Sequence, residues 1–113
     1  MDIEERLDFI EFRMDLLREG TELSKFLYDH NVTKSKIDQL YDTMDYFREQ
    51  IDAGKSVSSG DYEYRILKIM DDKKVDYHFC ESFARILWED GRYEEVFETL
   101  YKGFPKFEHL FNK

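Results

Sequence analysis

Four side chains that can hold a metal ion or move a proton stand close together in the sequence: Asp76, His78, Cys80 and Glu81. Metal ligands on one helix face are three or four residues apart, because a helix turns once in about 3.6 residues. Asp76, His78 and Cys80 are two residues apart and so point around a helix, whereas His78 and Glu81 share a face. The other two histidines bring no paired motif. The spacing therefore predicts a structural histidine and no metal site.

Nucleophilic catalysis needs a thiol or hydroxyl beside a base that is itself oriented by an acid. Cys80 lies between aromatic neighbours on a predicted helix, where burial raises the pKa of a thiol and makes it unreactive. Serines cluster between Ser56 and Ser59 with no histidine near them. The 26 acidic residues supply any number of carboxylate pairs, so no chosen pair carries information. We expect no enzyme activity, no catalytic residue and no cofactor.

Gly54, Lys55 and Ser56 match part of the sequence motif of a phosphate-binding loop, but the strand and the upstream glycine that such a loop needs are missing. The surrounding stretch, 53–61, is the only one rich in Gly and Ser, and no periodic pattern passes through it. We interpret it as the long loop of a single domain that spans residues 1–113.

The composition is that of a packed protein with a solvated acidic surface. Hydrophobic residues make up 42% and aromatic residues 17%, which excludes a disordered chain. The formal net charge of −9 repels nucleic acid and anionic lipid. A single cysteine cannot form an internal disulfide, no apolar run is long enough to span a membrane, and the first residues are too acidic for a signal peptide. These features predict a cytoplasmic protein.

The elements that position these residues are predicted to be helices throughout. Apolar residues recur at helical spacing over 2–19, 23–27, 34–53 and 62–70, and on both sides of Gly91 within 75–101. Gly20 interrupts the first pair of helices, while Thr33 and Asp76 are suited to cap later ones. The pattern predicts an all-α bundle of five to six helices. It ends in a C-terminal helical hairpin that reverses at Gly91 and a short helical turn over 104–111.

The first helix carries apolar residues spaced alternately by four and three, which is the 3.5-residue period of a coiled coil. The pattern is shorter than the three or four heptads of a secure coiled coil, so an ordinary bundle helix is the alternative, and Phe9, Phe12 and Leu16 widen the apolar face. Trp88 either seals the edge of the C-terminal hairpin or meets a partner. The predicted interface of a homo-oligomer consists of Ile3, Leu7, Ile10, Met14, Leu17 and Trp88.

The stretch 26–40 resembles a DNA-reading helix-turn-helix, with the side chains of Lys34, Ser35, Lys36 and Gln39 toward the groove. Aspartates follow within two turns and repel phosphate, so a plain helix corner is the alternative. The hairpin around Gly91 also resembles one tetratricopeptide unit, but a single copy is no array.

Three segments together resemble the YhaI-like family of small helical proteins from low-GC Gram-positive bacteria. They read I-E-E-R-L-x-F-I near the start, then F-L-Y-D-H-N-V-T-K, then V-D-Y-H-F-C-E-S-F-A-R-I-L-W-E-D-G-R-Y-E-E-V-F. The resemblance is most specific at Asp76, His78, Leu87, Glu89, Gly91, Tyr93 and Phe97. It implies an intracellular, multihelical, oligomeric protein and brings no activity, cofactor or catalytic residue.

The sequence thus favours a self-associating protein-interaction or regulatory module, with no membrane and no nucleic acid among its partners. Two alternatives stay open. One is an acidic inhibitor that imitates nucleic acid, suggested by the carboxylates along 2–19 and 76–98. The other is a helix-turn-helix-like regulator that acts through the corner at 33–39.

Overall fold

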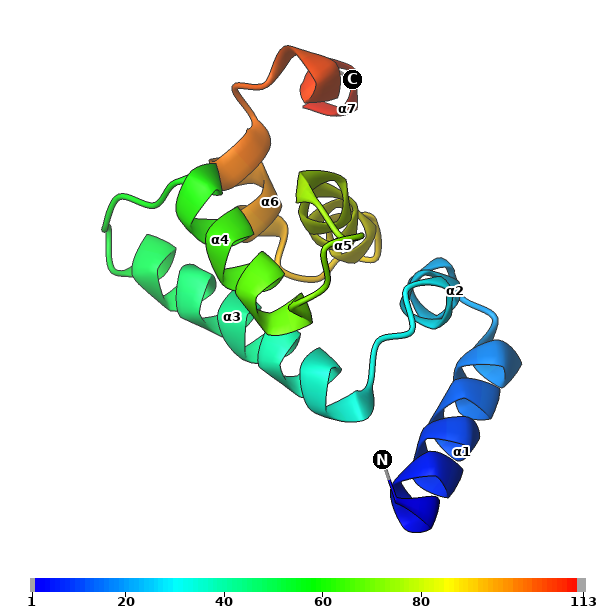
Figure 1. The fold of residues 1–113 in the computed structure, drawn as a ribbon. Helices are drawn as coiled ribbons and strands as arrows, with labels where there is room; N and C mark the ends of the chain where they lie inside the picture. Colours follow the sequence, from blue (N-terminus) through cyan, green and yellow to red (C-terminus); the bar gives the residue numbers. More distant parts are fainter. Residues whose placement is uncertain (1, 112–113) are drawn as a thin grey trace.

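The computed structural model describes residues 2–111, which form helices joined by short turns and contain no strand (Figure 1). The all-α prediction is confirmed. There are more helices in this range than the five to six predicted, because the C-terminal segment adds a 3₁₀ helix and one α-turn. In order they are α1 (Ile3–Glu19), α2 (Glu22–Asp29), α3 (Lys34–Asp52), α4 (Ser59–Met70), α5 (Tyr77–Glu89), α6 (Glu94–Tyr101), η1 (Pro105–Phe107) and α7 (Glu108–Phe111).

Local capping sets most of the helix boundaries, as predicted from single residues. Gly20 ends α1 in the left-handed conformation, with φ of 65°, where a Cβ would be strained. The Thr33 hydroxyl accepts a hydrogen bond from the Lys36 amide at 3.2 Å, and the Asp76 carboxylate accepts one from the His78 amide at 3.0 Å. These caps satisfy amides that lack a partner within their own helix.

The predicted loop at 53–61 ends earlier than expected. The Ser58 hydroxyl accepts a hydrogen bond from the Asp61 amide at 3.1 Å and starts α4 at Ser59. Gly60 therefore lies inside the first helical turn, although its composition suggests a loop. A good N-cap satisfies amides that would otherwise need water, and this outweighs the low helix propensity of one glycine.

Helix α5 is the centre of the core and is packed against α2, α4 and α6 (Figure 1). Six apolar side chains of α5 are buried, on more than one side of the helix: Phe79, Cys80, Phe83, Ala84, Ile86 and Leu87. Helix α3 covers α4 and α6 with a buried row of Ile37, Leu40, Met44 and Phe47. A helix enclosed in this way is stabilised by tertiary packing more than by its own propensity.

A tight reversal joins α5 to α6 and brings the two helices together. Gly91 has φ of 74°, and the Arg92 amide donates to the Leu87 carbonyl at 2.9 Å across it. The Leu87 carbonyl lies in the last turn of α5 and also accepts from the Asp90 amide at 3.1 Å, so both bonds help to close the end of the helix.

The C-terminal segment closes one end of the core. Phe107 of η1 packs against Phe97 and Tyr101, with ring centroids 5.3 Å and 5.6 Å away. Beside it, the Lys106 ammonium forms an ion pair with the carboxylate of Glu81 on α5, and Glu81 is only 6% exposed. A buried carboxylate needs such a partner, because an isolated charge is strongly disfavoured away from water.

Helix α1 stands apart from this body (Figure 1). It packs on α2, and α2 in turn packs on α5, so the molecule is elongated, with extents of 46 × 27 × 25 Å. None of the helices within residues 2–111 combines the length and the apolar character needed to cross a bilayer. Because α1 packs mainly on α2, one long side of α1 is exposed to solvent.

The Lys106–Glu81 pair predicts the effect of a substitution at the C-terminal closure. Lys106→Met leaves the Glu81 carboxylate buried without its partner. We expect the free energy of unfolding at neutral pH to fall by about 1–2 kcal/mol, a modest loss because Lys106 is about half exposed and partly screened by solvent. Urea unfolding followed by circular dichroism measures the change.

The pH dependence of this loss has a defined sign. The hydrogen bond to Glu81 is the main cause that raises the pKa of Lys106 above its ordinary value of 10.5. A raised lysine pKa contributes stability that is full below 10.5 and is lost as pH rises through the raised value. The gap between the two proteins should close in that alkaline range. Lys73→Met, in the exposed turn before α5, is the control, and a Lys106→Met variant of unchanged stability would contradict the prediction.

Candidate interaction surface

The apolar row predicted on the first helix lies on the uncovered side of α1. Its side chains are 47% exposed at the least, for Met14, and 75% at the most, for Ile3. Single exposed apolar residues are ordinary, but a contiguous row along one helix face marks a surface that meets something apolar. We call this row the α1 stripe, formed by Ile3, Leu7, Ile10, Met14 and Leu17.

The opposite face of α1 is turned toward the rest of the chain. Leu16 is buried and Phe12 is half-buried against the core. The Arg13 guanidinium lies 3.8 Å from the Tyr28 ring centroid and donates to the Tyr28 carbonyl at 3.1 Å and to the Asn31 side-chain oxygen at 2.6 Å. The broad apolar face expected from the sequence is thus divided, because Phe12 and Leu16 serve the fold while the stripe stays free.

Charged residues run along both edges of the α1 stripe. Helical spacing places Arg6 and Arg13 along one edge, and Glu4 and Glu11 with Arg18 along the other. Arg18 forms an ion pair with Asp15 at 3.2 Å, and Arg13 is held against α2 as described above. Among residues 2–111, Arg6, Glu4 and Glu11 form no ion pair, so these charges are left to face a second molecule at the stripe.

Trp88, the sixth residue of the predicted interface, is placed elsewhere. It is half-buried on α5, between the rings of Phe97 and Phe111 at 5.4 Å and 5.3 Å. Its indole N–H donates to the Glu98 carboxylate at 3.1 Å. Trp88 therefore contacts the C-terminal elements, and the structure does not bring it together with the α1 stripe.

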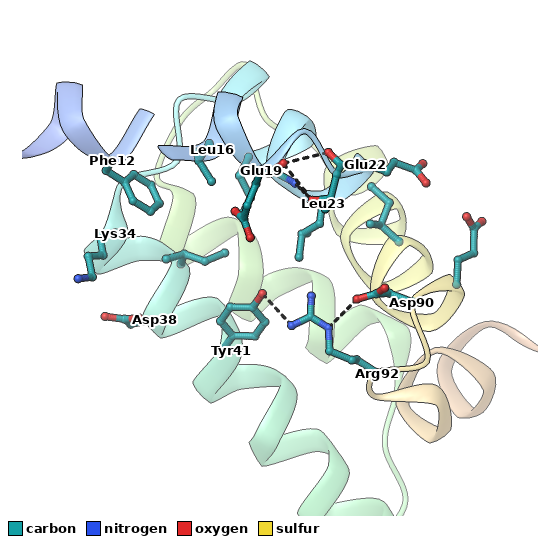
Figure 2. Close-up of a pocket in the computed structure, with 16 residues that line it drawn as sticks. Phe12, Leu16, Glu19, Glu22, Leu23, Lys34, Asp38, Tyr41, Asp90 and Arg92 are labelled. Carbon is teal, nitrogen blue, oxygen red and sulfur yellow. Dashed lines mark hydrogen bonds and ion pairs between the residues drawn. The ribbon is translucent and has the colours of Figure 1, made fainter. Parts of the chain in front are cut away.

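A cleft that the sequence did not reveal opens between α1–α2 and α3. Its volume is about 750 Å³, and Figure 2 shows Phe12 and Lys34 at one end and Asp90 and Arg92 at the other. The apolar side chains that line this α1–α3 cleft are Phe12, Leu16, Leu23, Leu27, Ile37 and Ile86. Its acidic lining comes from Glu19, Glu22, Asp38, Glu89 and Asp90. These residues come from four helices, so no local pattern in the sequence could join them.

The residues first considered for chemistry do not form a reactive centre. Within residues 2–111, no three side chains among His, Cys, Asp and Glu are grouped to hold a metal ion. His78 Nδ1 lies 3.2 Å from an Asp76 carboxylate oxygen, and hydrogen bonds from the His78 side chain and amide lower the pKa of Asp76. This pair caps α5 at the surface.

Cys80 is fully buried, as its aromatic neighbours predicted. Burial is the main cause that raises the pKa of its thiol to about 12, and the negative charge of Glu63 acts in the same direction. A thiol with such a pKa carries almost no thiolate at neutral pH and is a poor nucleophile.

Two of the four side chains expected to face a DNA groove are bonded within the chain. The Lys36 ammonium donates to the Met70 carbonyl at 2.7 Å and closes the end of α4. The Gln39 amide donates to the Ser35 carbonyl at 3.3 Å. The Lys36 bond ties the corner between α2 and α3 to the body of the protein, whereas Lys34, Ser35 and Gln39 are exposed.

Comparison with protein-family models, curated proteins and solved structures gives no match for the chain. The candidate surfaces therefore rest on the geometry alone. Two stand out: the α1 stripe, which is apolar and uncovered, and the α1–α3 cleft, which joins an apolar lining to an acidic one.

The state of Cys80 gives a direct chemical prediction. The folded protein should resist alkylation by iodoacetamide at about pH 8, near the pKa of a free thiol, because Cys80 is both buried and protonated. The same protein in urea should react fully, which is the internal control. Intact-mass measurement over time follows the reaction, and labelling of the folded protein at the rate of the unfolded one would contradict the assignment.

Proposed function

We propose that this protein is a self-associating interaction or regulatory module that assembles through the α1 stripe. The observation that supports the proposal is the row of five apolar side chains, each about half exposed or more, on the side of α1 turned away from its own core. Burying such side chains against a like surface removes apolar area from water, which is the main driving force of association.

The identity of the partner follows from the pattern of the stripe. Residues spaced by four and three form the seam along which identical helices pack side by side. A symmetric pair of such helices needs only one self-complementary surface, so a second copy of the chain is sufficient as partner. The resemblance to the YhaI-like family, which implies an oligomer, supports the same proposal.

The charges beside the stripe favour parallel helices. In the parallel arrangement, Arg6 of one chain faces Glu11 of the next chain, five positions further along the seam. With the N-terminal part of the stripe overlapped in the antiparallel arrangement, Glu4 would face Glu11, and Arg6 would lie opposite Arg13, which is already held against Tyr28 and Asn31. The antiparallel pairing therefore places two carboxylates together and gives Arg6 no carboxylate partner, which disfavours it.

The order of residue types bears on the number of chains. Leu7 and Met14 occupy the first core position of the heptad, whereas Ile3, Ile10 and Leu17 occupy the second. Leucine in the first position with isoleucine in the second favours three or four parallel helices over two. We therefore expect an assembly larger than a dimer.

Leu7→Asp should dissociate the assembly, because it places an unpaired charge in an apolar seam, and Ile10→Asp should do the same. Sedimentation equilibrium at about 50 μM detects association with a free energy of about −6 kcal/mol or stronger. Ser35→Asp, which adds the same charge at an exposed position on α3, is the matched control and should assemble normally. A folded wild-type protein that sediments as a monomer under these conditions would remove the proposal.

The orientation is tested by reversing one charge and then both. Arg6→Glu should weaken a parallel assembly, since the introduced carboxylate then faces Glu11 of the neighbour, and adding Glu11→Arg should restore it. In the antiparallel arrangement Arg6 has no carboxylate partner to lose, so the first change alone should not weaken association. Sedimentation of the wild type, the single variant and the double variant ranks the strength of their association, and this ranking distinguishes the parallel from the antiparallel arrangement.

A further inference from the structure

The α1–α3 cleft has two features of a binding site: a partly apolar lining and the size of a ligand cleft. Part of its lining is apolar, with contributions from α1, α2, α3 and α5. Its volume of about 750 Å³ falls within the range of clefts that take ligands. The α1 stripe faces away from it, so an occupant of the cleft is compatible with self-association. We propose that the cleft is a docking site for a short basic amphipathic segment of another protein.

Two cations also line the cleft, Lys34 and Arg92, and Arg85 lies beside it, so the acidic lining is partly neutralised from within the chain. Arg92 pairs with Asp90 at 3.0 Å and donates to the Tyr41 hydroxyl at 3.4 Å, while Arg85 pairs with Glu89 and lies 3.7 Å from Glu22. Three of the five carboxylates are therefore compensated by arginines of the same chain.

The other two carboxylates, those of Glu19 and Asp38, form no ion pair or side-chain hydrogen bond within residues 2–111. They belong to opposite walls, since Glu19 ends α1 and Asp38 lies on α3. Figure 2 shows the Glu19 carboxylate directed into the cleft toward Tyr41, with Asp38 on the α3 side. A cation bound between these walls would meet negative charge from both.

The chemistry of the occupant follows from this arrangement. Apolar side chains of an incoming segment would cover Phe12 and Leu23, the two apolar lining residues that are only half-buried, and lysine or arginine side chains beside them would reach Glu19 and Asp38. A small polyamine would satisfy the carboxylates but leave Phe12 and Leu23 partly exposed to water. Nucleic acid and anionic lipid carry the wrong charge for these walls. An amphipathic basic peptide is the occupant that satisfies both linings.

A synthetic peptide of about 14 residues, four helical turns, with leucines on one face and lysines on the other, serves as the probe. Its fluorescence anisotropy is titrated with the full-length protein. We expect saturable binding that weakens as salt rises. The same peptide with glutamate in place of lysine should not bind. Failure of the lysine peptide to bind the wild-type protein overturns the proposal.

Matched charge variants localise the binding. The double variant Glu19→Gln with Asp38→Asn should weaken binding about fivefold, the size expected for two exposed ion pairs. The control, Glu49→Gln with Asp52→Asn, removes the same charges from the far end of α3 and should bind like the wild type. An equal loss in both double variants would mean attraction by overall acidity alone and would refute the site.

Two further readouts separate this site from its alternatives. In nuclear magnetic resonance titrations, the peptide should shift the signals of Leu23, Ile37 and Ile86 in the cleft. Shifts confined to Leu7 and Met14 would place the peptide on the α1 stripe and overturn the proposal. Displacement of the peptide by an equal concentration of spermine would identify a polyamine site instead. These measurements test the cleft alone. If they show no binding there, the proposed assembly through α1 is unaffected, because sedimentation tests it separately.

Discussion

The contact between Phe26 of α2 and Phe79 of α5 is the interaction on which both surfaces depend. The two rings are stacked with centroids 4.9 Å apart, and His30 meets the edge of Phe79 at 5.0 Å. Because α1 packs on α2 and α2 packs on the central α5, this aromatic contact places α1 relative to the body. Offset and edge-to-face aromatic pairs have defined geometry and add stability beyond their buried area. The position of α1 therefore follows from a contact that α1 itself does not make.

That position gives α1 two different faces. The side with Phe12 and Leu16 is directed toward α2 and the cleft, whereas the α1 stripe is directed to solvent. A helix fully embedded in the core would have no free stripe, and a helix detached from α2 would form no wall for the cleft. The Arg13 guanidinium, placed against Tyr28 and bonded to Asn31, holds α1 between these extremes. One arrangement thus produces two separate surfaces for binding.

Much of this fold could be predicted because its signals are local. Helical periodicity, the break at Gly20 and the Thr33 and Asp76 caps each depend on a few neighbouring residues, and the structure confirms them. The start of α4 differs from the prediction, because the N-cap at Ser58 outweighs the loop-like composition around Gly60. Which apolar face of α1 is buried is decided by α2, so periodicity alone could not separate Leu16 from the stripe. The cleft joins residues from four helices, and only tertiary structure brings them together.

The net charge of −9 acts on the two surfaces in opposite senses. Copies of an acidic chain repel one another, so the assembly that we propose for the α1 stripe would draw its free energy from apolar burial and from the opposite charges of Arg6 and Glu11. A basic segment is attracted by the same field, and the unpaired Glu19 and Asp38 focus that attraction at the cleft. Salt screens both effects, which favours self-association and disfavours capture of the basic segment. In the function that we propose, the acidic surface therefore limits how tightly copies of the chain associate through the α1 stripe, and it favours basic partners at the cleft.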